Sequence, residues 1–509
     1  MKHPHPTRRR SGMVLVIVAA VVAMISLAGL AFVTTVHVEG KGVRVQADQL
    51  QLEHVVGSGT ELVKAFFEQP AGVQREAGGS WDNPGRFQGV LVLDDEDTGR
   101  RARLSVVAPA GGDGEPSPVS FGAVRFGVEN ESARLNLGVL LSWDERVPGS
   151  AHQALMGLPG MTDAVADAIL DWIDPDPTPR PFGAEADYYQ GLGVPYAPRN
   201  GVPQCLEELL LVRGVTRSML FGPDASFNQR IEPARRRPGA VRATSRFASQ
   251  GPPWASLLTV SSAERNQSDA GQPRIELNQP KLAALHEALK KAFEPAWADF
   301  IVLYRQHGPY AGTGAGEPPG TRAGVPVDLA LPPAVALDSV LDLVDAKVQI
   351  PAAAGRAARV IASPFASDPP SMRDYLPKLM DRTSAVSDPV IYGRINVNLA
   401  RREVLRAVPG LDAATVDQIL AARGPAAGHD LPERRHATWL LTEGLVDLAR
   451  MKALLPYLTG SGDVVRAQVV ASFDRAGPAR RAEILVDATA NPPRQVYFKD
   501  LRLLGRTGL

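Results

Sequence analysis

The sequence contains almost no cysteine, few aromatic residues and no excess of charge of either sign. Its single cysteine among 509 residues, Cys205, excludes an intrachain disulfide and any zinc site built from several cysteines. Aromatic residues make up 6% of the chain, so platforms for stacking nucleic-acid bases are not indicated. The 55 basic and 55 acidic residues balance, which argues against a globally basic nucleic-acid binder.

Signatures of catalysis are missing as well. The sequence has no Gly-x-Ser-x-Gly elbow and no His-Glu-x-x-His motif. The glycine-rich segment 312–316 is not preceded by a strand pattern and lacks the lysine of a phosphate-binding loop. Acidic side chains cluster only in one turn-rich loop, without a basic or nucleophilic companion. We therefore expect that the chain is not an enzyme.

Charge is absent from one long apolar segment near the N-terminus, Met13–Val36. As a helix, its 24 residues would extend about 36 Å, which is enough to cross a hydrocarbon core of about 30 Å. Lys2 and the arginines at 8–10 precede it, so this flank should stay in the cytoplasm and the C-terminal bulk should lie outside. A cleaved secretory signal is the alternative, although its apolar stretch usually has only about 7–15 residues.

The segment after the apolar run alternates between helical and strand patterns. The apolar spacing over 40–67 predicts an imperfect continuation of the helix, loosened at Gly57 and Gly59. Alternating, β-branched stretches at Phe87–Leu93, Ala102–Val107 and Val119–Phe126 then predict three strands. The expected fold class is α+β, with a long N-terminal helix packed on an antiparallel sheet.

An internal repeat interrupts this pattern. Arg134-Leu-Asn-Leu137, followed by a Pro-Gly turn and a helix, is repeated at Arg394-Ile-Asn-Val-Asn398, and a fainter copy begins at Arg274. The repeat predicts a large α-helical insertion of the helix-hairpin-helix or SAM-like kind. Hairpins of this type can bind DNA, but they need a second glycine, and Thr162 and Asp412 stand at that position. A structural hairpin is therefore favoured over DNA binding.

Four carboxylates lie within fourteen residues of the first repeat: Asp174, Asp176, Glu185 and Asp187. Calcium takes six to eight oxygen ligands, so a cluster that offers only oxygen suits it. The alternative is a set of helix caps in a solvated loop.

Two features of the sequence resemble a known family. Arg8-Arg9-Arg10-Ser11-Gly12, followed directly by Met13-Val14-Leu15, resembles the prepilin leader of type IV pilins and type II secretion pseudopilins. The order Asp-Trp-x-Asp-x-Asp from Asp171, then Gly-Ala-Glu-x-x-Tyr-Tyr from Gly183, resembles the helical domain of the K-type minor pseudopilins, the GspK family. That resemblance covers about residues 8–36, 120–220 and 390–475.

The resemblance implies a processing and assembly pathway. The prepilin peptidase would cut after Gly12 and methylate Met13. Most pseudopilins have Glu at the fifth mature position, here Ile17, and the K-type subunits characteristically lack it. The implied protein is a non-catalytic inner-membrane subunit with one membrane span and a periplasmic C-terminal domain. It would bind calcium, cap the tip of the pseudopilus and contact minor pseudopilins of the I and J type, with no nucleic-acid partner.

The predicted organisation follows from these features. It consists of a leader at 1–12, a transmembrane helix at 13–36, pilin-like helix and strands at 37–134, a first helical part with the acidic loop at 135–225, a linker and family-divergent region at 226–390, a second helical part at 391–460 and C-terminal strands at 461–509.

Overall fold

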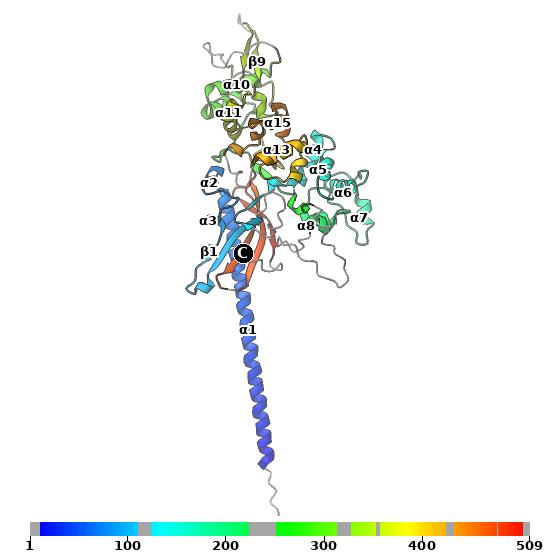
Figure 1. Cartoon of the computed structure of the whole chain (residues 1–509), viewed down its shortest axis with the longest axis vertical. Coiled ribbons are helices and arrows are strands. Elements are labelled where there is room, and N and C mark those ends of the chain that lie inside the picture. The colour runs from blue at the N-terminus through cyan, green and yellow to red at the C-terminus, as the bar shows by residue number, and fades with distance from the viewer. Residues whose placement is uncertain are drawn as a thin grey trace, which may run out of the picture.

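The computed structural model describes residues 11–109, 124–222, 251–312, 327–352, 357–423, 432–475 and 477–501. Most of the predicted leader, the first part of the predicted strand at 119–126 and residues 226–250 lie outside this set. Within it the chain forms a long helical stem, an antiparallel sheet on the upper part of the stem, and a helical head beyond the sheet (Figure 1). The predicted α+β class with a long apolar N-terminal helix is confirmed.

The stem is one uninterrupted helix, α1 (Ser11–Glu68). Its first part is apolar and exposed, whereas its last turns bury Leu52, Val56, Val63 and Phe66 against the sheet. The prediction that glycines loosen the helix is wrong. A Cβ atom added to Gly59 would lie 2.4 Å from Cγ1 of Val469, so this glycine lets the helix approach the sheet closely.

The sheet combines strands from both ends of the chain, in the order β1-β2-β15-β16-β17, with β3 beside β2 and β4 beside β15. All of its pairings are antiparallel. The predicted strand from Phe87 starts later than expected, because Phe87 ends a short helix and packs edge-on against Phe66. The elements of this pilin-like part that follow α1 are α2 (Ala71–Glu76), α3 (Pro84–Phe87), β1 (Val90–Leu93), β2 (Ala102–Pro109), β3 (Val124–Arg125), β4 (Glu129–Asn130), β15 (Val464–Phe473), β16 (Ala479–Asp487) and β17 (Arg494–Asp500).

The head consists of three helical modules, and each is closed by a parallel pair of two-residue strands. The first module (135–259) contains β5 (Leu135–Asn136), α4 (Leu140–Arg146), α5 (Ser150–Met156), α6 (Asp163–Ile173), α7 (Ala186–Gln190), α8 (Arg217–Phe221) and β6 (Leu258–Thr259). The second module (275–384) contains β8 (Ile275–Glu276), α9 (Leu282–Ala292), α10 (Pro295–His307), β9 (Lys347–Ile350), β10 (Arg359–Ala362), α11 (Pro369–Arg382) and β11 (Thr383–Ser384). The third module (395–459) contains β13 (Ile395–Asn396), α12 (Arg402–Arg406), α13 (Ala413–Arg423), α14 (Trp439–Thr442), α15 (Leu448–Leu454) and β14 (Leu458–Thr459).

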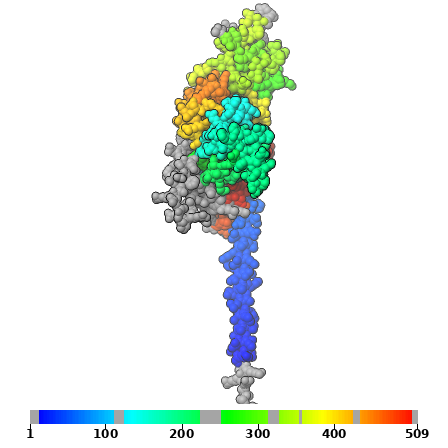
Figure 2. Space-filling view, turned by 90° about the vertical axis from the view of Figure 1, so that its right-hand side faces the viewer, coloured from blue at the N-terminus to red at the C-terminus, as the bar shows by residue number. Residues whose placement is uncertain are grey.

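The second module lies within the region 226–390, whose fold the sequence does not predict. Strands β7 (Ala263–Arg265) and β12 (Val390–Tyr392) pair antiparallel at its base. The three modules share one hydrophobic core, and α1 and the sheet form another. The second module lies at the end of the molecule farthest from the start of α1, and the first module stands out on one side (Figure 1). Figure 2 looks onto that side, with the first module in front.

Candidate functional site

The residues predicted to act in processing and assembly lie in the first turns of α1. Among the described residues α1 is the one helix long and apolar enough to cross a membrane, judged by length and composition. Met13 and Ile17 are exposed, and no atom lies within 4 Å of a Cβ added to Gly12. Since packing within this chain does not constrain these three positions, their roles stay predictions.

The acidic loop connects α6 to α7. Asp171 lies in the last turn of α6 and is fully buried, Asp174 caps the C-terminus of that helix, and Glu185 stands just before α7. The ring of Trp172 in α6 packs edge-on against that of Tyr189 in α7, with 5.3 Å between the ring centroids, and this contact joins the two ends of the loop. The loop therefore returns Glu185 to the end of the helix that carries the two aspartates.

One arginine partly balances these carboxylates. Nη1 of Arg180 donates a hydrogen bond to Oδ1 of Asp171 at 2.8 Å and a second one to Oδ2 of Asp174. The backbone N–H of Arg180 also donates to Asp171. Gly183 packs directly on this pair, since a Cβ there would lie 1.8 Å from Oδ2 of Asp171. A side chain at this position would have to displace the buried carboxylate of Asp171, which accounts for the glycine of the Gly-Ala-Glu motif.

Three buried carboxylate oxygens at this site have no hydrogen-bond partner: Oδ1 of Asp174 and both Oε atoms of Glu185. Burial, reinforced by the charges of Asp171 and Asp174, raises the pKa of Glu185 to about 7. Burial is also the main cause that raises the pKa of Asp174. Buried polar atoms are normally paired, so these oxygens have the capacity to accept hydrogen bonds or to bind a cation.

The structure therefore brings together only part of the predicted ligand set. Asp174 and Glu185 are buried in the loop, and the charge of exposed Asp176 also raises the pKa of Glu185. Asp187 is exposed on α7 and is not among the carboxylates that raise this pKa. The fourth nearby carboxylate is Asp171, which sequence reasoning missed. Within the described ranges no three His, Cys, Asp or Glu side chains converge in metal-binding geometry, so the fit to a divalent cation is partial.

The two Pro-Gly hairpins do not present free helix N-termini. In the third module Oδ1 of Asp412 accepts a hydrogen bond from the N–H of Thr415 at 2.7 Å, and its Oδ2 is bound by Arg450 at 2.6 Å. These bonds lower the pKa of Asp412 to about 2, so the turn carries a negative charge at neutral pH. In the first module the hydroxyl of Thr162 caps α6 in the same way. A DNA phosphate would meet these capping side chains instead of bare N–H groups.

A buried glutamate connects the first module to the sheet. Glu131 is fully buried, and it accepts hydrogen bonds from Arg134, from Thr259 of β6 and from Nε of Arg466 in β15 at 2.8 Å. Arg466 also donates to Glu483 of β16 at 2.9 Å. The two arginines lower the pKa of Glu131 to about 2 despite its burial. The carboxylate therefore stays ionised and holds together three segments that are far apart in sequence.

The third module repeats this arrangement with different connectivity. Glu264 of β7 accepts from Arg394 at 3.2 Å and from Oγ1 of Thr459 in β14 at 2.5 Å. Arg394 precedes Ile395-Asn396 just as Arg134 precedes Leu135-Asn136. In both modules the arginine before the opening strand and the threonine of the closing strand thus share one buried glutamate.

Comparison with known families bears on the segment that carries the acidic loop. Residues 133–221 match the family described as type II secretion system (T2SS), protein K. The chain carries a protein K domain. This domain coincides with the first module up to α8, and the resemblance to the K-type family is confirmed for this segment.

The other comparisons add little to the protein K match. The crystal structure of the GspK-GspI-GspJ complex from the type 2 secretion system of enterotoxigenic Escherichia coli contains a chain that is 11% identical. The match covers 91% of this chain and 99% of that one, with a TM-score of 0.34, which is too low to establish a common fold. No curated protein matches the sequence.

Proposed function

We propose that this chain is a K-type minor pseudopilin of a type II secretion system. The observation that carries the proposal is a protein K domain on a chain whose apolar N-terminal helix continues into a helix-on-sheet domain. In this role α1 anchors the protein in the inner membrane after the prepilin peptidase has cut behind Gly12, and the rest of the chain lies in the periplasm. The protein acts by contact rather than by catalysis.

We further propose that the protein caps the tip of the pseudopilus. The head projects beyond the sheet at the end opposite the apolar helix, and the first module widens it on one side (Figures 1 and 2). Other subunits can assemble beside and below α1, whereas the head occupies the space above. Ile17 fits this position, because a tip subunit has no neighbour above it whose amine would need a buried carboxylate. The partners below are minor pseudopilins of the I and J type.

The copy number of the chain in assembled fibres tests the capping role. Crosslinked pseudopili analysed by quantitative mass spectrometry should contain about one copy of this chain per fibre, together with the I- and J-type subunits and many copies of the major subunit. The major subunit in the same digest is the internal reference. Copies of this chain in proportion to fibre length would refute the cap and leave the pseudopilin assignment intact.

We also propose that the acidic loop binds calcium. The support is the set of unpaired buried oxygens on Asp174 and Glu185, next to Asp171 and the exposed Asp176. A bound Ca²⁺ would coordinate these oxygens and tie the loop to the end of α6. Arg180 supplies positive charge at this site when no metal is bound. Asp187, included in the sequence-based set, is not needed for this site.

Calcium removal should therefore destabilise the protein. A ligand at 100 times its Kd stabilises the folded state by about 2.7 kcal/mol, so chelation should lower the melting temperature by several degrees. Asp174→Ala combined with Asp176→Ala should abolish this response. Asp187→Ala is the matched control, because it removes an exposed carboxylate from the adjacent helix α7, and it should respond to chelator like the wild type. Identical melting curves with and without chelator would leave the carboxylates only a capping role.

A further inference from the structure

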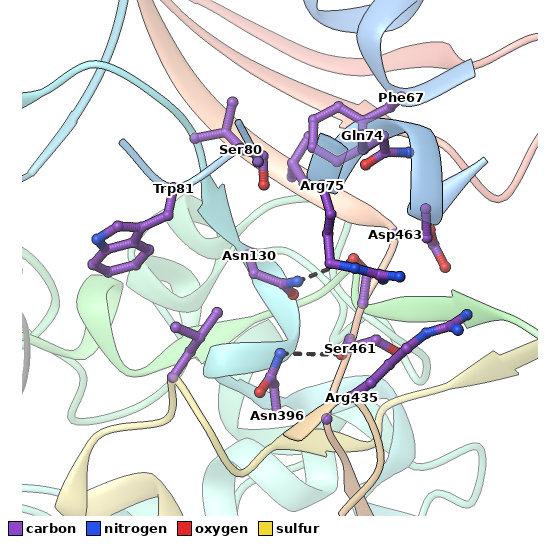
Figure 3. A pocket seen from close by; sticks show the side chains of 17 residues that line it. Phe67, Gln74, Arg75, Ser80, Trp81, Asn130, Asn396, Arg435, Ser461 and Asp463 are labelled. Carbon is purple, nitrogen blue, oxygen red and sulfur yellow. Dashed lines mark hydrogen bonds between the residues drawn. The ribbon is translucent and has the colours of Figure 1, made fainter. Parts of the chain in front are cut away.

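A pocket lies where the pilin-like part meets the helical head. It has a volume of about 130 Å³, and its walls come from α2, from the segment 460–463 that leads back to the sheet, and from Arg435 of the third module. Figure 3 shows Arg75 and Arg435 on one side of it and Asn130 and Asn396 across from them. The side-chain amide groups of Asn130 and Asn396 already donate hydrogen bonds to the backbone carbonyls of Gly462 and Ser461, respectively.

Two guanidinium groups, of Arg75 and Arg435, and one carboxylate, of Asp463, line this pocket. Arg75 pairs with Asp269, and Arg435 pairs with Asp269 at 2.9 Å and with Asp381 at 2.6 Å. A third guanidinium, Arg274, is bonded to the backbone carbonyl of Asp381. Arg75 and Arg435 therefore share the carboxylate of Asp269, and Arg435 also binds that of Asp381. Asp463 also lines the pocket, and its carboxylate accepts hydrogen bonds from the backbone and side chain of Arg265.

Burial and nearby arginines shift the pKa values of two groups beside the pocket. His436 is adjacent to Arg435, and burial together with the charges of Arg274, Arg435 and Arg75 holds its pKa well below the ordinary value. Burial is the main cause that lowers the pKa of Arg435; the charges of Asp381 and Asp269 oppose this effect, and the charge of Arg75 adds to it. An additional negative charge in the pocket would relieve both effects.

The two arginines also have hydrogen-bonding capacity to spare. A guanidinium carries five N–H donors. In the described part of the chain only Nη2 of Arg75 and only Nη1 of Arg435 donate a side-chain hydrogen bond. None of their remaining nitrogens is a fully buried unpaired atom, and both side chains line the pocket.

We propose that this pocket binds a small oxyanion with a carboxylate or phosphate group. Two guanidinium groups of fixed geometry are the preferred partners of such groups. The volume suits a ligand of this size, since a water molecule takes about 30 Å³ in the liquid and the pocket equals about four of them. The bound anion bridges α2 of the pilin-like part and Arg435 of the head, so it stiffens the junction between them. This inference does not depend on the capping role.

Anion-dependent stabilisation of the purified full chain in detergent tests the proposal. Inorganic phosphate and malonate are titrated separately at constant ionic strength, with chloride as the reference salt. We expect a saturable rise in melting temperature with at least one of them, and the more effective anion identifies the phosphate or the carboxylate class. Arg75→Gln and Arg435→Gln should each raise the concentration for half-maximal stabilisation at least tenfold.

Arg402→Gln is the matched control, because Arg402 is an exposed arginine that pairs with Asp417 away from the pocket, and its anion response should equal that of the wild type. Arg435→Lys keeps the charge but loses the planar fork, so it should retain part of the response even if Arg435→Gln is too unstable to measure. No stabilisation beyond that of chloride, or equal responses in the wild type and both pocket variants, would overturn the proposal.

Discussion

Replacing Glu131 with alanine is expected to lower the free energy of unfolding by about 3–5 kcal/mol, because it leaves Arg134 and Arg466 in a buried place without their shared carboxylate. Glu131 is fully buried, and the side chains of Arg134 and Arg466 are 7% and 18% exposed. Urea unfolding of the full chain in detergent, followed by tryptophan fluorescence, measures this loss. Five of the six tryptophans, at 143, 172, 254, 297 and 439, belong to the head or its core.

Glu129→Ala is the matched control for this change. Glu129 pairs with the same Arg134 at 3.0 Å, but its side chain is 28% exposed. Partly exposed pairs contribute within about 1 kcal/mol, so this variant should stay close to the wild type. Equal losses in the two variants, or a loss below about 1 kcal/mol for Glu131→Ala, would show that the buried glutamate does not organise the junction.

The stability of the wild-type protein at acidic pH should also depend on the ionised carboxylate of Glu131. The pKa of Glu131 is lowered from 4.5 to about 2 on folding. A lowered pKa of an acid means that the ionised group stabilises the folded state, so its contribution is complete above pH 4.5 and disappears as the pH falls toward 2. The Glu131→Ala variant lacks this contribution and should lose less stability than the wild type over that range.

The partners of these glutamates show where sequence reasoning stops. The Arg-x-Asn repeat at Arg134 and Arg394 is visible in the sequence, because the two copies have the same local pattern. The glutamates that bind these arginines cannot be identified in the sequence in the same way, because Glu131 precedes Arg134 by three residues whereas Glu264 precedes Arg394 by 130. A motif can be recognised in a sequence when its residues keep a constant spacing. A contact that forms only in the tertiary fold has no constant spacing, so the sequence does not reveal it.

The acidic loop illustrates the same limit on a smaller scale. Residue type and density identify the loop, but they do not distinguish buried Asp171 and Asp174 from exposed Asp187. The available signal was Gly183, since a glycine within a motif often marks a place where another group approaches the backbone closely. Gly59 in α1 likewise marks a close approach, here between the helix and the sheet. There, packing on the sheet overrides the low helix propensity that predicted a break.

The second module was hardest to predict. Its opening strand, Ile275–Glu276, and its closing strand, Thr383–Ser384, have two residues each, too few to produce a periodic pattern. Its long helices were easier. Apolar residues recur at helical spacing in the range where α9 and α10 lie, and Pro295 is the first residue of α10. Helices of several turns can thus be predicted from the sequence, whereas the pairs of two-residue strands that close each module cannot.

Gly12→Lys is expected to abolish maturation of the protein completely. The proposed peptidase cuts directly after Gly12, and a long charged side chain at the cut should exclude the substrate from its site. The retained leader keeps Lys2 and the arginines at 8–10 on the cytoplasmic side, so α1 cannot leave the membrane to join a fibre. Mass spectrometry of the N-terminus of membrane-extracted protein should find Met1, or its processed form, in the variant and methylated Met13 in the wild type.

The structure makes this experiment specific, because a Cβ at Gly12 meets no other atom of the chain within 4 Å, so the substitution should not disturb the fold. Gly40→Lys is the matched control. Gly40 lies in the same helix beyond the apolar segment 13–36, and a Cβ there also meets nothing within 4 Å. Its product should begin at methylated Met13. A wild-type chain that begins at Met1, or one cut near Phe32 as by a secretory signal peptidase, would refute the pseudopilin pathway, because α1 would then be either a permanent anchor or a discarded signal.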